Sequence, residues 1–262
     1  MHLFIHIGTH KTGTTSLQAF LYEHSAEMVA AGIYVPVSGT VNEASGKTAV
    51  HHNLAFELMG DSRYDQARGG LNEMVAELRD SNTHAAIISS EELSYLVENP
   101  EGLHLLEHTL YEERHSISWL MFCRRVDDYS ESLYGLLMGC GIRPSLGYAG
   151  FVLKILLNGK YTQNRKFCRT VHYFDFADFA CRWRSLSSSP LHLLDYDRAA
   201  SGSGVLPSFL RAIGAPSSLI DASGEAPRRN PRREKVLCRY RRLLRPLLMA
   251  RFHRSNLQML NG

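Results

Sequence analysis

The stretch that most constrains the fold lies in residues 3–21. Apolar residues alternate at positions 3, 5 and 7, which predicts a short buried strand, and recur at helical spacing at 17, 20 and 21. A turn rich in Gly and Thr lies between them, from Gly8 to Thr15. A strand that leads through such a turn into a helix can hold an anion, because backbone N–H groups and the helix dipole point at one spot. Gly8 and Gly13 allow close backbone approach, and Lys11 adds a positive charge. The stretch therefore predicts a phosphate site.

This turn differs from the Walker A loop of ATP- and GTP-binding proteins, whose pattern is G-x-x-x-x-G-K-[ST]. Gly8 and Gly13 keep the Walker spacing, but Thr14 stands where the lysine belongs. The lysine of this turn, Lys11, precedes the second glycine instead. A kinase or an ATPase would therefore lack the lysine that contacts its β- and γ-phosphates. An ordinary helix-capping turn without a ligand is the alternative interpretation of these residues.

Strand and helix patterns alternate along the rest of the chain. Buried strands are expected at residues 32–36, 84–90, 117–123 and 191–194. Helices are expected at residues 51–58, 66–78, 103–111, 127–138, 151–157, 173–183 and 206–213. Residues 37–50 are expected to form a loop. This alternation predicts a three-layer, P-loop-like α/β fold with a central parallel sheet flanked by helices.

The charge distribution separates the C-terminal segment from the rest of the chain. Residues 228–254 hold eleven Lys or Arg and one acid, whereas the remainder holds 18 basic and 25 acidic residues. We therefore expect an α/β domain over residues 1–225 and a basic helical segment over 226–262, packed on that domain or extending from it.

The function of the basic segment is open on sequence grounds. Apolar residues at helical spacing between Val236 and Leu248 could lie on an anionic membrane surface, although Pro246 should interrupt this helix. A terminal helix packed on the body, with its basic face in solvent, is the alternative. Nucleic acid is a less favoured partner. Tyr240 is the one aromatic residue that we find among the basic residues and that could support such binding.

The cysteine pattern and the hydropathy of the chain predict where in the cell the protein is located. Five scattered cysteines without a C-x-x-C pair argue against a disulfide scaffold or a zinc site and favour a reducing cytoplasm. No apolar run approaches the ~18–20 residues of a membrane span. The chain enters a strand pattern at once, so we expect no export signal. A cytoplasmic protein, peripheral at the inner membrane face if the basic segment binds lipid, is the resulting prediction.

A second motif follows the strand expected at residues 117–123. Arg124 ends that strand, and Ser132 lies eight residues further on, in the predicted helix. The arginine can reach across the strand-to-helix turn, and the serine faces back from about the second helical turn. A guanidinium suits a phosphate because it pairs with two oxygens at once. The alternative interpretation is that Arg124 and Arg125 form surface ion pairs with Asp127 or Asp128.

Three polar motifs should meet at one edge of the sheet. In parallel sheets, ligands bind outside the carboxyl ends of the strands. The turn from Gly8 to Thr15, the pair Glu91 and Glu92, and Arg124 each follow a predicted strand. We therefore expect them to form a single site.

Taken together, these motifs resemble those of sulfotransferases that use 3′-phosphoadenosine 5′-phosphosulfate (PAPS), in particular the bacterial type. The run Lys-Thr-Gly-Thr-Thr at residues 11–15 resembles their 5′-phosphosulfate loop, and Arg124 with Ser132 resembles their 3′-phosphate motif. Residues 89–96 also resemble an acidic strand-end segment of carbohydrate sulfotransferases. The resemblance covers most of the chain and is specific at the two phosphate motifs. It implies a P-loop-like fold, PAPS as donor, no metal, and sulfuryl transfer to a hydroxyl or amine.

The resemblance also assigns residues to the donor. Lys11 is expected on the leaving phosphate oxygen. His10 could contact the sulfate, and a packing role beside the loop is the alternative. The 5′-phosphate would be bound by Thr12, Gly13, Thr14 and Thr15, and the 3′-phosphate by Arg124 and Ser132. Arg228 and Arg229 could fold back onto the 3′-phosphate, although the glycines of that segment in animal cytosolic relatives are missing here.

The acceptor must lose a proton to a base. Glu91 is the first candidate for this base, Glu92 the second and His52 the third. A small-molecule or glycan acceptor is expected, most of all a carbohydrate or glycolipid precursor, in a pocket built from loops such as residues 37–50 and 139–148. The alternative function is a P-loop nucleotide-binding protein, kinase-like or catalytically silent. A kinase would need a magnesium ligand and a Walker lysine, and neither is recognisable in this sequence.

Overall fold

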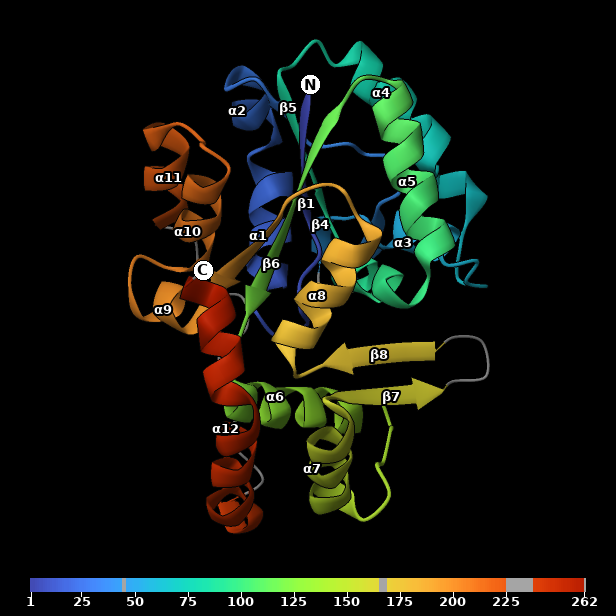
Figure 1. The fold of residues 1–262 in the computed structure, drawn as a ribbon. Helices are drawn as coiled ribbons and strands as arrows, with labels where there is room; N and C mark the ends of the chain where they lie inside the picture. Colours follow the sequence, from blue (N-terminus) through green and yellow to red (C-terminus); the bar gives the residue numbers. More distant parts are fainter. Residues whose placement is uncertain (44–45, 165–168, 225–237, 262) are drawn as a thin grey trace.

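The computed structural model describes residues 1–43, 46–164, 169–224 and 238–261 (Figure 1). Five parallel strands form the central sheet in the order β2-β5-β1-β6-β9. Their bounds are Ile33–Tyr34 for β2, Ala85–Ser89 for β5, His2–His6 for β1, Ser116–Cys123 for β6 and Leu191–Asp195 for β9. The predicted α/β class and central parallel sheet are confirmed.

The sheet separates two hydrophobic cores, because successive side chains of a strand point to opposite faces. Ile88 of β5 and Trp119 of β6 belong to one core, whereas their neighbours Ile87 and Leu120 belong to the other. Strands buried on both faces consist of continuous apolar runs, which is why β5 and β6 were recognisable in the sequence.

Helices cover both faces of the sheet, as the three-layer prediction requires (Figure 1). On one face lie α1 (Thr14–Glu23), α2 (Ser25–Ala30), α9 (Tyr196–Ser201), α10 (Val205–Ala212) and α11 (Ser217–Gly224). On the other lie α3 (His52–Leu58), α4 (Leu71–Asp80), α5 (Pro100–Glu112) and α8 (Phe176–Leu186), together with the 3₁₀ helix η2 (Glu91–Glu98).

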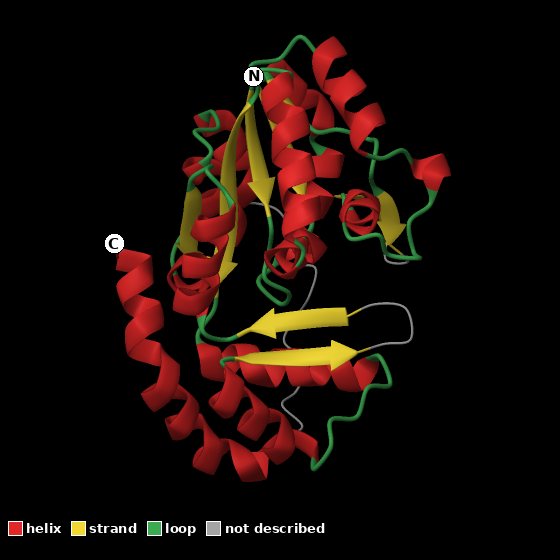
Figure 2. Ribbon diagram, turned by 45° about the vertical axis from the view of Figure 1, so that its right-hand side comes forward, coloured by secondary structure: helices red, strands yellow, loops and turns green. Residues whose placement is uncertain are grey.

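A further group of elements lies beneath the carboxyl ends of the strands (Figures 1 and 2). It consists of α6 (Val126–Gly139), α7 (Gly147–Asn158), α12 (Cys238–Asn261) and an antiparallel hairpin of β7 (Lys160–Asn164) and β8 (Arg169–Tyr173). We call these five elements the α6–α7–α12 lobe.

The C-terminal helix α12 packs on the body of the protein. Leu248 and Phe252 are fully buried. The buried Asn256 amide accepts a hydrogen bond from the Phe176 N–H at 2.9 Å and donates one to the Phe174 carbonyl at 2.9 Å. The division of the chain near residue 225 stays a prediction, because residues 225–237 lie outside the described part.

Several local predictions were wrong. Residues 37–50, expected as a loop, contain an antiparallel hairpin of β3 (Val41–Glu43) and β4 (Gly46–Val50). The helix expected at residues 66–78 is a 3₁₀ turn, η1 (Gln66–Arg68), followed by α4, because Gly69 has a φ of +69° and ends the first turn.

Two further corrections concern helix ends. Residues 173–183 were expected to be helical throughout, but Tyr173 ends β8 and α8 begins only at Phe176. The Asp175 side chain caps α8 by accepting the Asp178 N–H, which fixes that start. Pro246 does not end α12, which runs through it. Figure 2 shows the helix curving along its length, and a proline in a packed helix bends it rather than breaking it.

Candidate functional site

The loop between β1 and α1 has the backbone of an anion cradle. Gly8, Lys11 and Gly13 have φ angles of 85°, 65° and 82°. A left-handed conformation is costly for a lysine, and such strain is typical of functional loops. The Thr12 hydroxyl donates to the Thr9 carbonyl and closes the turn. Helix α1 begins at Thr14, and the N–H groups that open a helix have no acceptor within it. In this first turn the Ser16 N–H donates back to the Gly13 carbonyl at 3.1 Å. The loop can therefore bind an anion through its backbone.

Glu91 lies against this loop rather than in open solvent. Its side chain accepts a hydrogen bond from the Thr14 hydroxyl at 3.1 Å and one from the Gln18 amide at 3.0 Å. The His10 Nδ1 lies 3.6 Å from the same carboxylate. Burial alone would raise the pKa of Glu91, but the hydrogen bond from His10 and the charges of His52 and His10 hold it far below its usual range. Glu91 is thus an ionised carboxylate that joins the loop, α1 and the end of β5.

His10 projects from the loop and has two aromatic neighbours. Its Nε2 lies 2.7 Å from the Tyr95 hydroxyl, and its ring centroid lies 5.3 Å from that of His172 on β8. Burial lowers the pKa of His10, but the hydrogen bond and charge of Glu91 outweigh it and raise the pKa above 6.5. Tyr95 and His172 were not assigned to the site from the sequence. Tyr95 follows the glutamate pair by a few residues, whereas nothing distinguished His172 among 13 histidines.

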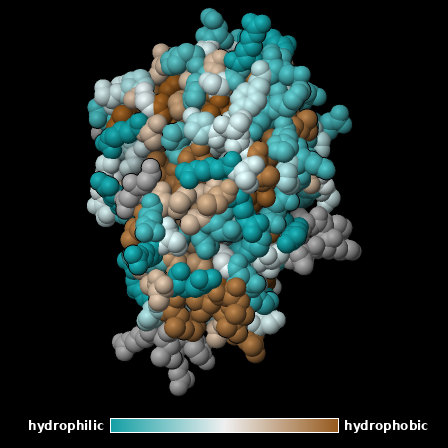
Figure 3. Space-filling model, in the orientation of Figure 1, coloured by the Kyte–Doolittle hydropathy of each residue, from teal (hydrophilic) through white to brown (hydrophobic). Residues whose placement is uncertain are grey.

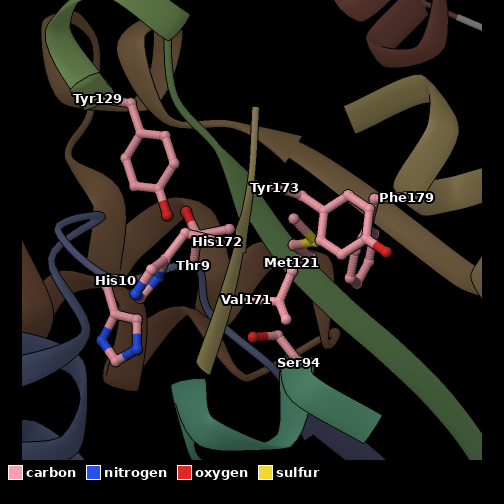
Figure 4. Close-up of a pocket in the computed structure, with 9 residues that line it drawn as sticks. All are labelled: Thr9, His10, Ser94, Met121, Tyr129, Val171, His172, Tyr173 and Phe179. Carbon is pink, nitrogen blue, oxygen red and sulfur yellow. The ribbon is translucent and has the colours of Figure 1, made fainter. Parts of the chain in front are cut away.

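A small cavity of about 10 Å³ opens beside His10 (Figure 4). This volume corresponds to about one water molecule. Figure 4 shows the Tyr129 hydroxyl pointing toward His172 and Thr9, with His10 beside them. The lining residues are Thr9, His10, Ser94, Met121, Tyr129, Val171, His172, Tyr173 and Phe179.

The other two candidate bases lie at the same strand end. His52 opens α3, and its Nδ1 lies 2.7 Å from the Ser90 hydroxyl. Glu92 pairs with Arg63 at 3.4 Å, and Arg63 also holds Asp61 at 2.7 Å. Glu92 is therefore held on the α3 side of η2.

Arg124 and Ser132 are in direct contact. A terminal nitrogen of the Arg124 guanidinium donates to the Ser132 hydroxyl at 2.9 Å and to the Lys11 carbonyl at 3.0 Å. The guanidinium carbon lies 5.1 Å from the ring centroid of Tyr196, the first residue of α9. Tyr196 is a further site neighbour that the sequence did not reveal. The ion pair with Asp127 that was the alternative for Arg124 is made by Arg125, at 2.9 Å.

One donor of Arg124 is left over. The side chain is 9% exposed, and its Nε is buried without a hydrogen-bond partner within the described structure. A buried N–H without an acceptor is costly and rare. An anionic ligand that reached this nitrogen would remove the cost. The site therefore has a cation and an anion-binding loop joined by one hydrogen bond.

A larger cavity of about 280 Å³ lies next to the small one, since Val171 lines both. It contacts the site through Tyr95, which bonds His10, and through Arg63, which pairs with Glu92. None of the described residues of the loops at 37–50 and 139–148, which were expected to build an acceptor pocket, lines it. Its lining residues are Met59, Gly60, Asp61, Arg63, Tyr95, Glu98, Asn99, Arg169, Thr170 and Val171.

Some predicted features fall outside these observations. Arg228 and Arg229 lie outside the described residues. In the part of the chain that is described, no group of three or more His, Cys, Asp or Glu side chains is arranged to hold a metal ion. No helix of that part is both long and apolar enough to cross a membrane.

Comparisons with known proteins support the fold. No protein-family model matches the chain, and a comparison with curated proteins finds no match. Among solved structures, a sulfotransferase from Alicyclobacillus acidocaldarius is similar, with a TM-score of 0.51 and 16% sequence identity. The match covers 98% of this chain and 95% of that one. At this identity the likeness concerns the fold alone.

Proposed function

We propose that this chain is a PAPS-dependent sulfotransferase of the bacterial, carbohydrate-sulfotransferase-like type. The observation that carries the proposal is the contact of Arg124 with both Ser132 and the backbone of Lys11, which joins the two phosphate motifs. The structural likeness to a sulfotransferase over nearly the whole chain supports it. The odd, scattered cysteines add a cytoplasmic location to the proposal.

The residues present fit a nucleotide with two anionic groups. The 5′-phosphate would be held by the loop residues Thr12, Gly13, Thr14 and Thr15. Their backbone N–H groups would donate most of the hydrogen bonds, because the Thr12 and Thr14 hydroxyls already donate to other acceptors. Arg124 and Ser132 would hold the 3′-phosphate, and the unpartnered Arg124 Nε supplies a donor for it. Arg228 and Arg229 remain candidates for the same phosphate.

The reaction requires little covalent chemistry from the protein. The sulfur–oxygen bond to the 5′-phosphate breaks, and a bond from sulfur to the acceptor oxygen forms. Lys11 would stabilise the charge that develops on the leaving phosphate oxygen. Transfer of this kind, like phosphoryl transfer, depends mainly on positioning and on electrostatic stabilisation.

The acceptor proton has to go to a base on the other side of the sulfur from Lys11. We assign this function to His10, held in place by Glu91, because Glu91 itself is buried, ionised and occupied by Thr14 and Gln18. A carboxylate that orients a histidine in this way is a known catalytic arrangement. Direct action of Glu91, with Glu92 and His52 as second and third choices, is the alternative that variants can separate.

The larger cavity is the proposed acceptor site. Its charged lining residues are balanced: Arg63 pairs with Asp61 at 2.7 Å, and Arg169 pairs with Glu98 at 3.9 Å. Paired charges of opposite sign offer many hydrogen-bond donors and acceptors but do not favour a ligand of either charge. Such a lining suits a neutral polyhydroxyl compound. Its volume of about 280 Å³ is near the lower end of small-molecule sites. A hydroxyl of a carbohydrate or of a glycolipid precursor is therefore the proposed acceptor.

The donor proposal is tested by thermal-shift titration with 3′,5′-adenosine bisphosphate (PAP), the desulfated donor, against ATP with magnesium. A ligand that binds the native state raises the melting temperature. PAP should stabilise the wild type without metal, and Arg124→Ala should lose this response. The matched control is Arg125→Ala, which removes the neighbouring arginine that pairs with Asp127. Stabilisation by ATP with magnesium alone would contradict the proposal in favour of a kinase-like site.

The acceptor proposal is tested by sulfate transfer from radiolabelled PAPS to neutral sugars, glycolipids and phenols. Arg169→Ala should raise the acceptor KM by roughly tenfold, leave kcat unchanged and leave PAP binding intact. Arg182→Ala is the control, since Arg182 is similarly exposed and pairs with Asp178 on α8, outside the cavity. Equal effects of the two variants would contradict the cavity assignment.

A further inference from the structure

We propose that the α6–α7–α12 lobe docks on the surface of an anionic lipid bilayer. This inference goes beyond the proposed sulfotransferase activity and does not depend on it. It begins from the charge pattern of the two stretches that form most of the lobe. Residues 132–174 and 238–262 together hold twelve Lys or Arg and no Asp or Glu, so all 26 acidic residues of the chain lie elsewhere.

The acidic residues that belong to the lobe lie in the first half of α6. They are Asp127, Asp128 and Glu131. Asp127 is buried and pairs with Arg125 and with Arg245 of α12, so its charge is compensated inside the protein. Two carboxylates approach the lobe from neighbouring elements. Glu98 pairs with Lys160 of β7 at 2.7 Å, and Asp175, two residues after the end of β8, accepts the Asp178 N–H of α8.

Large apolar side chains stand exposed on the same elements. Leu153 and Leu157, one helical turn apart on α7, are 52% and 72% exposed, and Leu146, directly before α7, is 85% exposed. Met138 near the end of α6 and Leu247 on α12 are also exposed. Figure 3 shows hydrophobic surface gathered over α6 and α7. A group of exposed leucines of this kind marks an interaction site.

Exposed cations accompany these leucines. Arg143 and Lys154 are exposed beside Leu146 and Leu153 in the sequence, and Arg251 and Arg254 are exposed on α12. Apolar side chains that enter the acyl boundary, together with cations at the headgroups, are the two requirements of interfacial membrane binding. Nucleic acid would use the cations but would gain nothing from the leucines. The chemistry therefore fits a bilayer with anionic headgroups.

The proposal is tested with the full-length chain by vesicle co-sedimentation. Phosphatidylcholine vesicles with and without phosphatidylglycerol are the probes. The wild type should bind the phosphatidylglycerol vesicles at least roughly tenfold more strongly, and added salt should weaken this binding. The double variant Leu153→Asp/Leu157→Asp should lose at least roughly tenfold in binding, because its carboxylates are repelled by the anionic headgroups and cannot be buried cheaply.

The matched control is Leu105→Asp. Leu105 is 55% exposed on α5, which lies on the upper part of the protein in Figure 1, away from the lobe. This variant should bind vesicles like the wild type. A second variant, Arg143→Glu/Lys154→Glu, should weaken binding to phosphatidylglycerol vesicles while leaving the leucines in place. Circular dichroism of each variant establishes that the fold is retained.

Three outcomes would overturn the proposal. One is a wild type without preference for anionic vesicles, and another is a double leucine variant that binds as the wild type does. The third is a wild-type dimer that the leucine variant converts to a monomer without any change in vesicle binding, since the patch would then join two copies of the chain. A failure of PAP to stabilise the protein would contradict the sulfotransferase proposal alone and would leave the vesicle result standing.

Discussion

Gly8 lies directly against the backbone of Glu91. A Cβ added to Gly8 would come within 2.6 Å of the Glu91 Cβ and 2.9 Å of its Cα. Gly8 also has a φ of +85°, which an L residue adopts only with strain. The loop thus requires glycine at this position for two separate reasons. Their joint effect is to bring η2 close enough for Glu91 to reach Thr14 and Gln18.

Gly8→Ala should therefore destabilise the protein by roughly 3 kcal/mol, the sum of left-handed strain and an overpacked contact. The control is Gly214→Ala, because Gly214 has a φ of +70° but a Cβ added there would meet no atom of the described residues within 4 Å. It should cost only about 1 kcal/mol. Urea unfolding of both variants measures the difference. Equal losses would mean that the contact with Glu91 contributes nothing.

The sequence predicted the parts of the site that depend on local geometry. The strand, loop and helix around Lys11 are continuous in the chain, and the spacing of Arg124 and Ser132 is set by a single strand-to-helix turn. Buried strands such as β5 are visible because both of their faces are apolar.

The rest depended on tertiary contacts that no local pattern records. The hairpin of β7 and β8 carries His172 toward His10, although these residues lie 162 positions apart. Polar residues in β7 gave no strand signal. Glu91 was predicted to lie at the site, but its hydrogen bonds to Thr14 and Gln18 depend on how the end of β5 lies against the start of α1, which sequence spacing cannot predict.

Arg124→Lys tests whether the fork of the guanidinium matters beyond its charge. In Arg124 one terminal nitrogen donates to both Ser132 and Lys11, and the separate Nε can donate to a ligand. The single ammonium of lysine cannot reproduce this arrangement. We expect PAP affinity to fall by roughly tenfold, about 1.4 kcal/mol. The affinity for AMP, which lacks the 3′-phosphate, should change little. Isothermal titration calorimetry with both ligands measures this. A parallel loss for AMP would place Arg124 elsewhere on the nucleotide.

Two buried histidines should make the protein sensitive to acid. Burial lowers the pKa of His6 and of His51 to about 4. Below about pH 6.5 these histidines bind protons in the unfolded chain but not in the native protein. The free energy of unfolding therefore keeps its full value above that pH and falls as the pH drops toward 4. Each histidine should cost roughly 3 kcal/mol over this range.

His51→Gln should reduce that pH dependence. The His51 Nδ1 accepts the Ser89 N–H at 3.1 Å and its Nε2 donates to the Pro36 carbonyl at 3.0 Å, and a glutamine amide can supply both functions without titrating. Urea unfolding between pH 7 and roughly pH 5 measures the slope. His108→Gln is the control, because the His108 side chain is 72% exposed. An unchanged slope in His51→Gln would show that His51 does not titrate in this way.

Asn256 should be the main polar attachment of α12. Asn256→Ala leaves the Phe176 N–H and the Phe174 carbonyl buried without their partner, which should cost roughly 3 kcal/mol. Gln258→Ala, at an exposed position two residues further on, should change the stability by less than about 0.5 kcal/mol. Urea unfolding measures both values. Similar small losses would mean that Asn256 contributes little and that the other contacts of α12, through Leu248, Phe252 and the Arg245–Asp127 pair, hold the helix.

The identity of the base can be read from the pH dependence of sulfate transfer. If His10 takes the proton, the rate should rise with pH through a value above 6.5, since Glu91 raises the pKa of His10. Glu91→Gln removes that negative charge, so the rise should move to lower pH while activity persists at high pH. His10→Asn should reduce the rate by roughly 10²-fold or more at all pH values.

If Glu91 were itself the base, its low pKa would place the wild-type rise far below neutrality, and Glu91→Gln would be inactive throughout. The two assignments therefore predict opposite behaviour of one variant at high pH.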